Sequence, residues 1–272
     1  MTSAARRRPQ PGLRPGVRTR SAETVSDVYA IARRDMIRTA RQPEMLTFSV
    51  IMGIFFLLLF NYVFGGAIGA GSEVDYLQYL LPGVLVITAL NGAQQTGTGL
   101  ALDLSTGVVD RFRSLPMSQG AVIAGRTIAD TLRNAVGVLL VVVVGYLMGF
   151  RFASLPGAVG ALVLVIGLGF AFSWVGAAIA ARVRNAEMVG MLSMFWLFPL
   201  MLASSAFVPT DQMHDFVRLF AEVQPVSVVS DAARALSYGT PAEGPILGSL
   251  AWIAGLTVVF AALAARAYRR PS

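Results

Sequence analysis

The stretch FASLPGAVGALVLVIGLGFAFSWVGAAIAA, which covers residues Phe152–Ala181, contains no charged side chain. An α-helix rises 1.5 Å per residue, so about 20 consecutive apolar residues are enough to cross the hydrocarbon core of a bilayer. This stretch is longer than that, and it lacks the strict alternation of polar and apolar residues that a transmembrane β-strand requires. The sequence therefore predicts a helix that spans a membrane.

Five further uncharged stretches have the same character. They are Met45–Phe64, Tyr76–Leu102, Asn134–Phe150, Met188–Thr210 and Gly244–Ala265. Only Asn134–Phe150 is short for a span, and residues Ser118–Arg133 before it continue the helical pattern with a polar stripe of Arg126, Asp130 and Arg133. We therefore expect an all-α, polytopic membrane protein in which residues 44–270 form a domain of six transmembrane helices.

The arginines are distributed unevenly between the segments that connect these stretches. Six spans place both termini on one side of the membrane, and nineteen of the 22 basic residues, all of them arginine, then fall on that side. The three on the other side are Arg151, Arg218 and Arg234. Because basic residues accumulate in cytoplasmic segments, this bias predicts a plasma-membrane protein whose N- and C-termini are cytoplasmic. The net charge of +7 then indicates contact with anionic membrane lipids, and no nucleic-acid partner is expected.

The composition excludes several kinds of chemistry. The chain has no lysine, so it cannot form a Walker-type phosphate loop, and it has no cysteine for thiol catalysis or metal binding. Its single histidine, His214, lies in the segment predicted to be outside, where the sequence shows no partner for a metal or proton role. We therefore expect no catalytic residue, no metal site and no ATP hydrolysis by this chain.

The N-terminal region contains no span. Residues 1–23 are rich in arginine, proline and glycine, which is typical of a disordered, basic cytoplasmic tail. Residues 24–43 place apolar side chains such as Val28 and Met36 on one helical face and charged ones such as Asp27 and Arg34 on the other. This pattern predicts an amphipathic helix at the inner membrane interface; the alternative is a solvated linker before the first span.

The connection after the second span, residues 103–120, is short and charged. It reads DLSTGVVDRFRSLPMSQG, and it places Asp110, Arg111 and Arg113 around Phe112 before Pro116 stops helix formation. Arginines beside an aromatic residue can combine paired hydrogen bonds to carboxylates with burial, so the loop could dock into a groove of a cytoplasmic partner. The alternatives are that the arginines only anchor the topology and that the proline only stiffens the loop.

The same residues carry a resemblance. The run GVVDRFRSLPM at Gly107–Met117, followed by AGR at Ala124–Arg126, resembles the signature that follows the second of six spans in type-2 ABC transporter permeases of the daunorubicin-resistance kind. The resemblance also covers span order and loop lengths over residues 25–270. It implies the permease subunit of an exporter that works as a dimer, with itself or with a sister permease, together with separate cytoplasmic ATPase subunits that bind ATP and Mg.

This resemblance also implies roles for particular residues. The coupling residues, which would receive the movement of the ATPase, would be Asp110, Arg111, Phe112, Arg113 and Pro116. The expected substrate is an amphipathic compound similar to a drug, an antibiotic or a lipid, moved out of the cytoplasm or the inner leaflet. An exporter of polysaccharide or cell-wall precursors from the same superfamily is an alternative.

The outer segment, residues 208–243, is long and patterned. Met213, Phe216 and Phe220 share an apolar face with Val217 and Val223. Asp211, Asp215, Arg218 and Glu222 lie opposite, and Pro225 opens a second short helix. Two amphipathic helices here resemble the re-entrant or lid elements that the family places over its translocation path.

Few polar residues lie within the predicted spans. They include Asn61 in the first span and Asn91, Gln94, Gln95 and Thr98 in the second. Polar groups in a bilayer should face the protein interior, so these residues either line a pathway or form hydrogen bonds between helices. No carboxylate lies in the middle of a predicted span, which disfavours an ion-coupled secondary carrier. A membrane scaffold or intramembrane enzyme is the third alternative, and no catalytic dyad supports the enzyme.

Overall fold

The computed structural model describes residues 44–69, 75–106 and 119–268, and every regular element in these ranges is a helix. The elements are α2 (Glu44–Gly69), α3 (Tyr76–Ser105), α5 (Gln119–Met148), α6 (Leu155–Val183), α7 (Ala186–Leu202), the 3-10 helix η1 (Thr210–Gln212), α8 (Asp215–Val223), α9 (Pro225–Tyr238) and α10 (Glu243–Tyr268). The predicted all-α class is therefore confirmed for this part of the chain.

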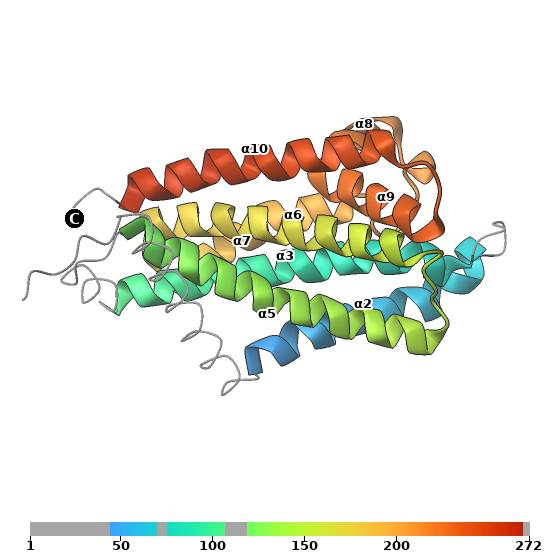
Figure 1. Ribbon diagram of the computed structural model, residues 1–272, viewed down its shortest axis with the longest axis horizontal. Coiled ribbons are helices and arrows are strands. Elements are labelled where there is room, and N and C mark those ends of the chain that lie inside the picture. The colour runs from blue at the N-terminus through green and yellow to red at the C-terminus, as the bar shows by residue number, and fades with distance from the viewer. Residues whose placement is uncertain (1–43, 70–74, 107–118, 269–272) are drawn as a thin grey trace, which may run out of the picture.

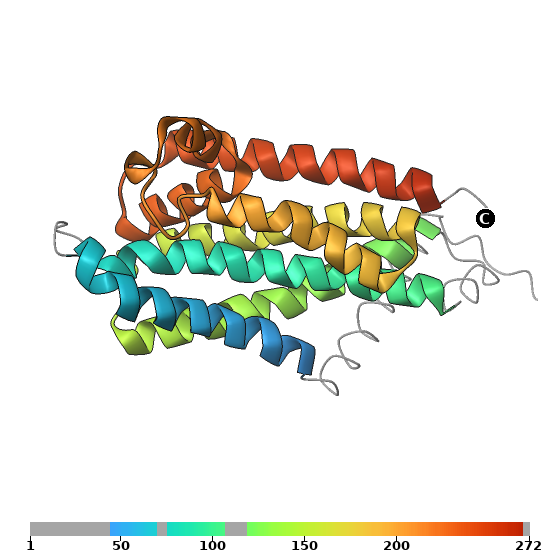
Figure 2. The same cartoon turned by 180° about the vertical axis from the view of Figure 1, so that it is seen from behind.

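The long helices lie side by side along the longest axis of the molecule (Figure 1). Successive long helices run in opposite directions, and the short helices α8 and α9 gather at one end of the bundle in both views (Figures 1 and 2). Residues 203–239, which include α8 and α9, are called the end cap below. The last residues of α10 lie at the other end of the bundle, which we call the opposite end.

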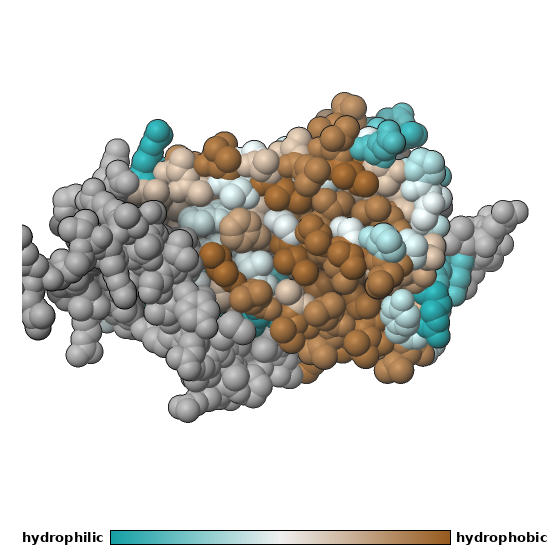
Figure 3. All heavy atoms as spheres, in the orientation of Figure 1, coloured by the Kyte–Doolittle hydropathy of each residue, from teal (hydrophilic) through white to brown (hydrophobic). Residues whose placement is uncertain are grey.

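Four of the helices are long and apolar enough to cross a membrane. They cover Tyr76–Ser105, Gly125–Met148, Leu155–Val183 and Glu243–Ala267. Two shorter apolar helical segments, Val50–Val63 and Ala186–Leu202, lie beside them. Apolar side chains cover most of the coloured face that α5, α6 and α10 form in Figure 3, and several hydrophilic residues lie at the end-cap end of this face. The protein is therefore a multi-pass membrane protein whose apolar surface faces lipid.

The third predicted span is confirmed as part of a longer helix. Residues Asn134–Phe150 were marginal in length, but α5 begins at Gln119 and continues without a break to Met148. The upstream polar stripe thus belongs to the same helix.

The fifth predicted span is wrong at its C-terminal end. Residues Met188–Thr210 are uncharged, yet α7 ends at Leu202 and the chain turns back into the bundle. Ser204 donates a hydrogen bond to the Met201 carbonyl at 2.6 Å, and Gln224 donates to the carbonyls of Leu200 and Ala203, at 2.9 Å each. These bonds satisfy carbonyl groups that the end of a helix leaves without partners, so the helix can stop inside an apolar environment.

Helix α3 is the centre of the bundle. It packs against α2, α5, α6, α7 and α9. In its most apolar 18-residue segment 83% is buried, compared with 6% in the corresponding segment of α10. The N-terminus of α3 is capped by Asp75, whose side chain accepts a hydrogen bond from the Leu77 amide. A displacement of α3 should therefore also displace the helices that pack against it, because well-packed interiors transmit strain.

Two glycines bring α3 and α6 into backbone contact. A Cβ atom added to Gly97 would lie 2.9 Å from the Cα of Gly176, and one added to Gly176 would lie 3.0 Å from the Cα of Gly97. Small residues permit this close approach, and van der Waals packing is a main source of helix association in lipid. The pair therefore sets the distance between the two most extensively packed helices.

The end cap is attached to α3 by a buried arginine. Arg234 of α9 donates to the Tyr79 carbonyl at 3.1 Å, to the Ser205 carbonyl at 3.0 Å and to Asp231 at 2.5 Å. Its guanidinium lies over the Tyr79 ring, 3.7 Å from the centroid. The Tyr79 hydroxyl donates to the same Ser205 carbonyl at 2.8 Å. Arg234 thus connects α9, α3 and the chain after α7 through charge-assisted bonds.

Gly97→Ala is expected to destabilise the protein because the added methyl group meets the backbone of Gly176. Overpacking of this kind costs about 1–3 kcal/mol, and a thermal unfolding experiment on the purified chain should show a lower Tm. Gly255→Ala is the matched control, because nothing lies within 4 Å of its added Cβ. Equal Tm values for the two variants would contradict the role of the Gly97–Gly176 contact.

Arg234→Ala is expected to lower the stability as well, since it removes the hydrogen bonds of the guanidinium to the Tyr79 and Ser205 carbonyls and the ion-pair partner of Asp231. Losing hydrogen bonds to a charged group costs about 1.5–3 kcal/mol, and the same thermal unfolding experiment measures it. The control is Arg218→Ala on α8, which removes an exposed partner of Glu222 and should change Tm little. If both substitutions have the same small effect, Arg234 does not hold the end cap.

Candidate functional site

Four charged side chains form a cluster near the opposite end of the bundle. They are Asp103 on α3 and Arg126, Asp130 and Arg133 on α5, and they are called the charged cluster below. Arg126 forms an ion pair with Asp103 and lies 3.6 Å from Asp130, which in turn pairs with Arg133 at 2.8 Å. None of the four side chains is more than 18% exposed. Each charge is therefore partly desolvated and compensated by a neighbour of opposite sign.

The position of the charged cluster is defined by the two helices that hold it. Asp103 lies in the last turn of α3, and Arg126 lies two turns after the start of α5. The chain between these helices includes residues 107–118. The Asp103–Arg126 ion pair therefore joins the two helices on either side of the charged loop.

The predicted coupling residues lie in that loop. Asp110, Arg111, Phe112, Arg113 and Pro116 all fall outside the described residues, as does the predicted interfacial helix at 24–43. Their assignment stays a prediction. The described chain ends at Thr106 before them and resumes at Gln119 after them.

The polar residues of the second predicted span are half-buried on α3. Gln94 donates a hydrogen bond to the Gly190 carbonyl of α7 at 3.4 Å, and Thr98 donates to the Gln95 carbonyl of its own helix at 3.1 Å. Asn61 and Asn91 are half-buried as well. Gln94 thus forms a long hydrogen bond to a neighbouring helix, whereas Thr98 bonds within α3. These contacts agree with hydrogen bonding between helices for Gln94 only, and pathway lining stays a prediction for the five residues.

The most deeply buried amide in the spans was absent from that set. Asn134 of α5 is 7% exposed and donates to the Ala89 carbonyl of α3 at 2.7 Å. In the sequence it was only the first residue of an apolar stretch, at the edge of the polar stripe. Because α5 begins at Gln119, Asn134 lies in the middle of this helix rather than at its start.

Helix α8 has the amphipathic pattern that the outer segment predicts. Asp215, Arg218 and Glu222 lie on its polar side, where Arg218 donates to Glu222 at 2.6 Å. This hydrogen bond raises the pKa of Arg218. His214 precedes the helix at its N-cap position and makes no side-chain capping bond there.

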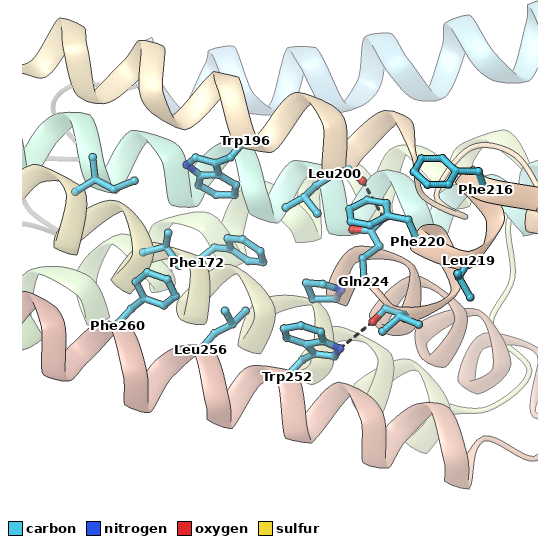
Figure 4. A pocket seen from close by; sticks show the side chains of 14 residues that line it. Phe172, Trp196, Leu200, Phe216, Leu219, Phe220, Gln224, Trp252, Leu256 and Phe260 are labelled. Atoms are coloured by element: carbon cyan, nitrogen blue, oxygen red, sulfur yellow. Dashed lines mark hydrogen bonds between the residues drawn. The ribbon is translucent and has the colours of Figure 1, made fainter.

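The apolar side of α8 covers one end of a cavity. Phe216 and Phe220 line this cavity of about 840 Å³, together with residues of α6, α7 and α10, and Figure 4 shows the Phe220 ring beside Gln224. Met213, the third residue predicted for this face, is half-buried and does not line the cavity. Two of the three residues predicted for the apolar face, Phe216 and Phe220, therefore share one site. Trp196, Trp252 and Gln224 belong to the cavity but were not identified from the sequence, because they come from three segments that only the folded bundle assembles.

The fold and these sites can be compared with known proteins. Residues 26–238 match the family model described as ABC-2 type transporter. The daunorubicin resistance ABC transporter permease protein DrrB1 of Streptomyces coeruleorubidus is 38% identical over 94% of this chain and 91% of its own length.

Two more distant relatives extend the comparison. The probable doxorubicin resistance ABC transporter permease protein DrrC of Mycobacterium tuberculosis is 26% identical over 95% of this chain and 94% of its own. The putative transport permease ycf38 of Porphyra purpurea is 23% identical over 79% of this chain and 75% of its own. The family model covers most of the chain, including the charged cluster and the end cap through α9, and so this chain belongs to the ABC-2 type transporter family.

Proposed function

We propose that this chain is the permease subunit of an ATP-driven exporter that carries amphipathic, drug-like molecules out of the cytoplasm or the inner leaflet. The observation that carries the proposal is the near full-length similarity to a permease whose name assigns it to daunorubicin resistance. ATP hydrolysis belongs to a separate ATPase subunit, since this chain lacks the lysine of a Walker-type loop. A second permease, identical or a sister chain, completes the transporter.

The proposed subunit would cross the membrane six times and keep both termini in the cytoplasm. The four long helices together with α2 and α7 give an even number of passes, which matches the alternating directions in Figure 1. Among the described residues, the end-cap end of the bundle carries fewer basic than acidic side chains. The basic ones are Arg151, Arg218 and Arg234, and the acidic ones are Asp75, Asp211, Asp215, Glu222, Asp231 and Glu243. A shortage of basic residues is typical of the external side, so the end cap is the outer, lid-like end.

The mechanism follows from the connection between the charged loop and the centre of the bundle. Movement of an ATPase bound to residues 103–120 would push on both ends of this loop. The Asp103–Arg126 ion pair makes α3 and α5 respond together, because separating them exposes two partly buried charges. Helix α3 then passes the movement to α6 and α7, against which it packs. Half-buried Asn61, Asn91, Gln94, Gln95 and Thr98 are proposed to line the path that opens.

Two alternatives remain distinguishable. A polysaccharide or cell-wall precursor exporter of the same superfamily would share the fold and the ATPase, but it would not confer drug efflux. An ion-coupled carrier would transport without ATP, and such carriers need an acidic group near the middle of the membrane. Among the described residues, the acidic side chains of the long helices lie at helix ends or pair with arginines in the charged cluster. Transport measured with and without ATP and with and without an ion gradient separates these classes.

Arg111→Glu is expected to uncouple the transporter while the bundle still folds. The substitution reverses a charge that we propose pairs with a carboxylate of the ATPase, so doxorubicin efflux per ATP hydrolysed should fall by about tenfold or more. Efflux and hydrolysis are measured together on the reconstituted complex. Arg14→Glu in the N-terminal tail is the matched control. Normal efflux in Arg111→Glu would show that the loop assignment is wrong.

Exchange of the two charges in the Asp103–Arg126 ion pair tests whether this pair connects α3 to α5 during transport. Asp103→Arg places a third positive charge beside Arg126 and Arg133, and Arg126→Asp places an acidic group beside Asp103 and Asp130, so each single variant should lose efflux per ATP hydrolysed. The double variant restores one pair of opposite charges and should recover part of the loss. If the double variant is as poor as the worse single variant, the ion pair does not link α3 to α5 during transport.

A further inference from the structure

The amide of Asn134 lies where three long helices meet. It is carried by α5, and its Nδ2 donates to the Ala89 carbonyl of α3 at 2.7 Å. Two glycines make room for it. A Cβ added to Gly92 of α3 would clash with Asn134 Oδ1, and one added to Gly169 of α6 would lie 3.0 Å from Asn134 Nδ2. The amide therefore fills a slot between α3 and α6, and α5 cannot move against either helix without moving it.

One half of this amide is unused. Asn134 Oδ1 is buried, and no described residue donates a hydrogen bond to it. A buried acceptor without a donor is costly, whereas a hydrogen bond between two helices contributes only modestly in a bilayer. The bond from Nδ2 alone is therefore a weak reason to keep an amide at this position. A donor that reaches Oδ1 after a small movement of the helices would remove the cost.

Thr96 provides a hydroxyl on the same face of α3. It follows Gly92 by one helical turn and precedes Gly99, whose added Cβ would lie 2.6 Å from the Arg126 guanidinium of α5. Since both glycines face α5, Thr96 between them faces α5 as well. Thr96 is buried, and its hydroxyl donates to the Gly92 carbonyl at 3.4 Å, which is longer than the about 2.5–3.0 Å usual for a hydroxyl donor. This hydroxyl can therefore change its acceptor at little cost.

We propose that Asn134 is a positioning residue that holds α5 at two positions along α3. In the arrangement described above, its Nδ2 is bound to the Ala89 carbonyl. In the second arrangement α5 is displaced along α3 toward the opposite end, by less than the about 5.4 Å of one helical turn, and the Thr96 hydroxyl donates to Asn134 Oδ1. Each arrangement gives the amide one hydrogen bond to α3, so neither is strongly favoured over the other.

The two positions give the charged loop a way to act on the bundle. Helix α5 begins at Gln119, directly after residues 107–118, so a pull or push on its first turn displaces it along α3. Arg126 contacts α3 at both Gly99 and Asp103, one turn apart, and its long side chain can follow a displacement of this size without losing its ion pair. The use of the displacement in transport rests on the proposed function, whereas the two positions themselves do not.

Distances between spin labels measure the displacement directly. The chain has no cysteine, so Leu102→Cys on α3 and Leu147→Cys on α5 supply two labelling sites at exposed positions. Because α3 and α5 run in opposite directions, the line between these sites follows the bundle, and a movement of α5 toward the opposite end shortens it (Figure 1).

Double electron–electron resonance on the labelled full chain in phosphatidylcholine vesicles should show two distances that differ by about 2–5 Å. The shorter distance should occur in about a tenth of the molecules or more, as expected for two arrangements of similar free energy. A single distance would overturn the proposal.

Three substitutions in the labelled chain assign the two distances. Thr96→Val keeps the shape of the side chain but removes the hydroxyl, so the shorter distance should be lost while the longer distance and the Tm stay unchanged. Asn134→Leu removes the amide and should leave one distance. Thr88→Val is the matched control, because this buried hydroxyl of α3 donates to the Val84 carbonyl of its own helix at 2.8 Å, and it should retain both distances. The shorter distance persisting in Thr96→Val, or vanishing in Thr88→Val, would overturn the proposal.

ATP-driven efflux separates this inference from the proposed function. Once the ATPase partner is added to the same vesicles, doxorubicin efflux per ATP hydrolysed should fall several-fold in Thr96→Val and stay unchanged in Thr88→Val. Efflux from a wild-type complex that shows a single distance would support the exporter and reject the two positions. Two distances that Thr96→Val reduces to one, in a complex without efflux, would support the two positions and reject the exporter.

Discussion

The inability of a bilayer to form hydrogen bonds determines most of this structure. Backbone groups in the hydrocarbon core must bond within the protein, which is why the described chain is a bundle of long helices. Within residues 44–69, 75–106 and 119–268, the end cap is the longest interruption of the long helices, and there side chains of the protein supply hydrogen-bond partners for the backbone. Gln224 bonds the carbonyls at the end of α7, and Arg234 bonds those of Tyr79 and Ser205. Without Gln224 the Ala203 carbonyl would lose this hydrogen-bond donor, whereas the Ser205 carbonyl also accepts a bond from the Tyr79 hydroxyl.

The two ends of the bundle differ in chemistry. The opposite end carries partly buried ion pairs that join α3 to α5, and the end cap carries an aromatic cavity beneath an amphipathic helix. Helix α3 connects the two ends, since it holds Asp103 near its last turn and Tyr79 in its first turns. A force applied at the charged loop therefore reaches the end cap through a single, well-packed helix. This arrangement agrees with the proposal that a separate ATPase drives the permease from the side of the charged loop.

Much of the fold was predictable because the signals are local. Uncharged stretches gave the spans, and Pro225 at the first turn of α9 marked the start of that helix. The end of α7 was not predictable, because Ala203–Thr210 is as uncharged as the helix before it, and the turn depends on hydrogen bonds from Gln224 and Arg234 far along the chain. Asn134 and the cavity residues were missed for the same reason, since their environment comes from several helices. The coupling residues, which lie outside the described part of the chain, remain predictions.

The central claim is that the loop at residues 103–120 receives a cytoplasmic ATPase, and a single-thiol cross-link in the native membrane tests it most directly. The chain contains no cysteine, so Ser114→Cys supplies a unique thiol in the loop and Thr240→Cys supplies one at an exposed position after α9. After reaction with a short thiol cross-linker, mass spectrometry identifies the attached protein. The account predicts an ABC ATPase attached at position 114 and not at position 240. No ATPase at position 114, or equal attachment at both positions, would contradict it.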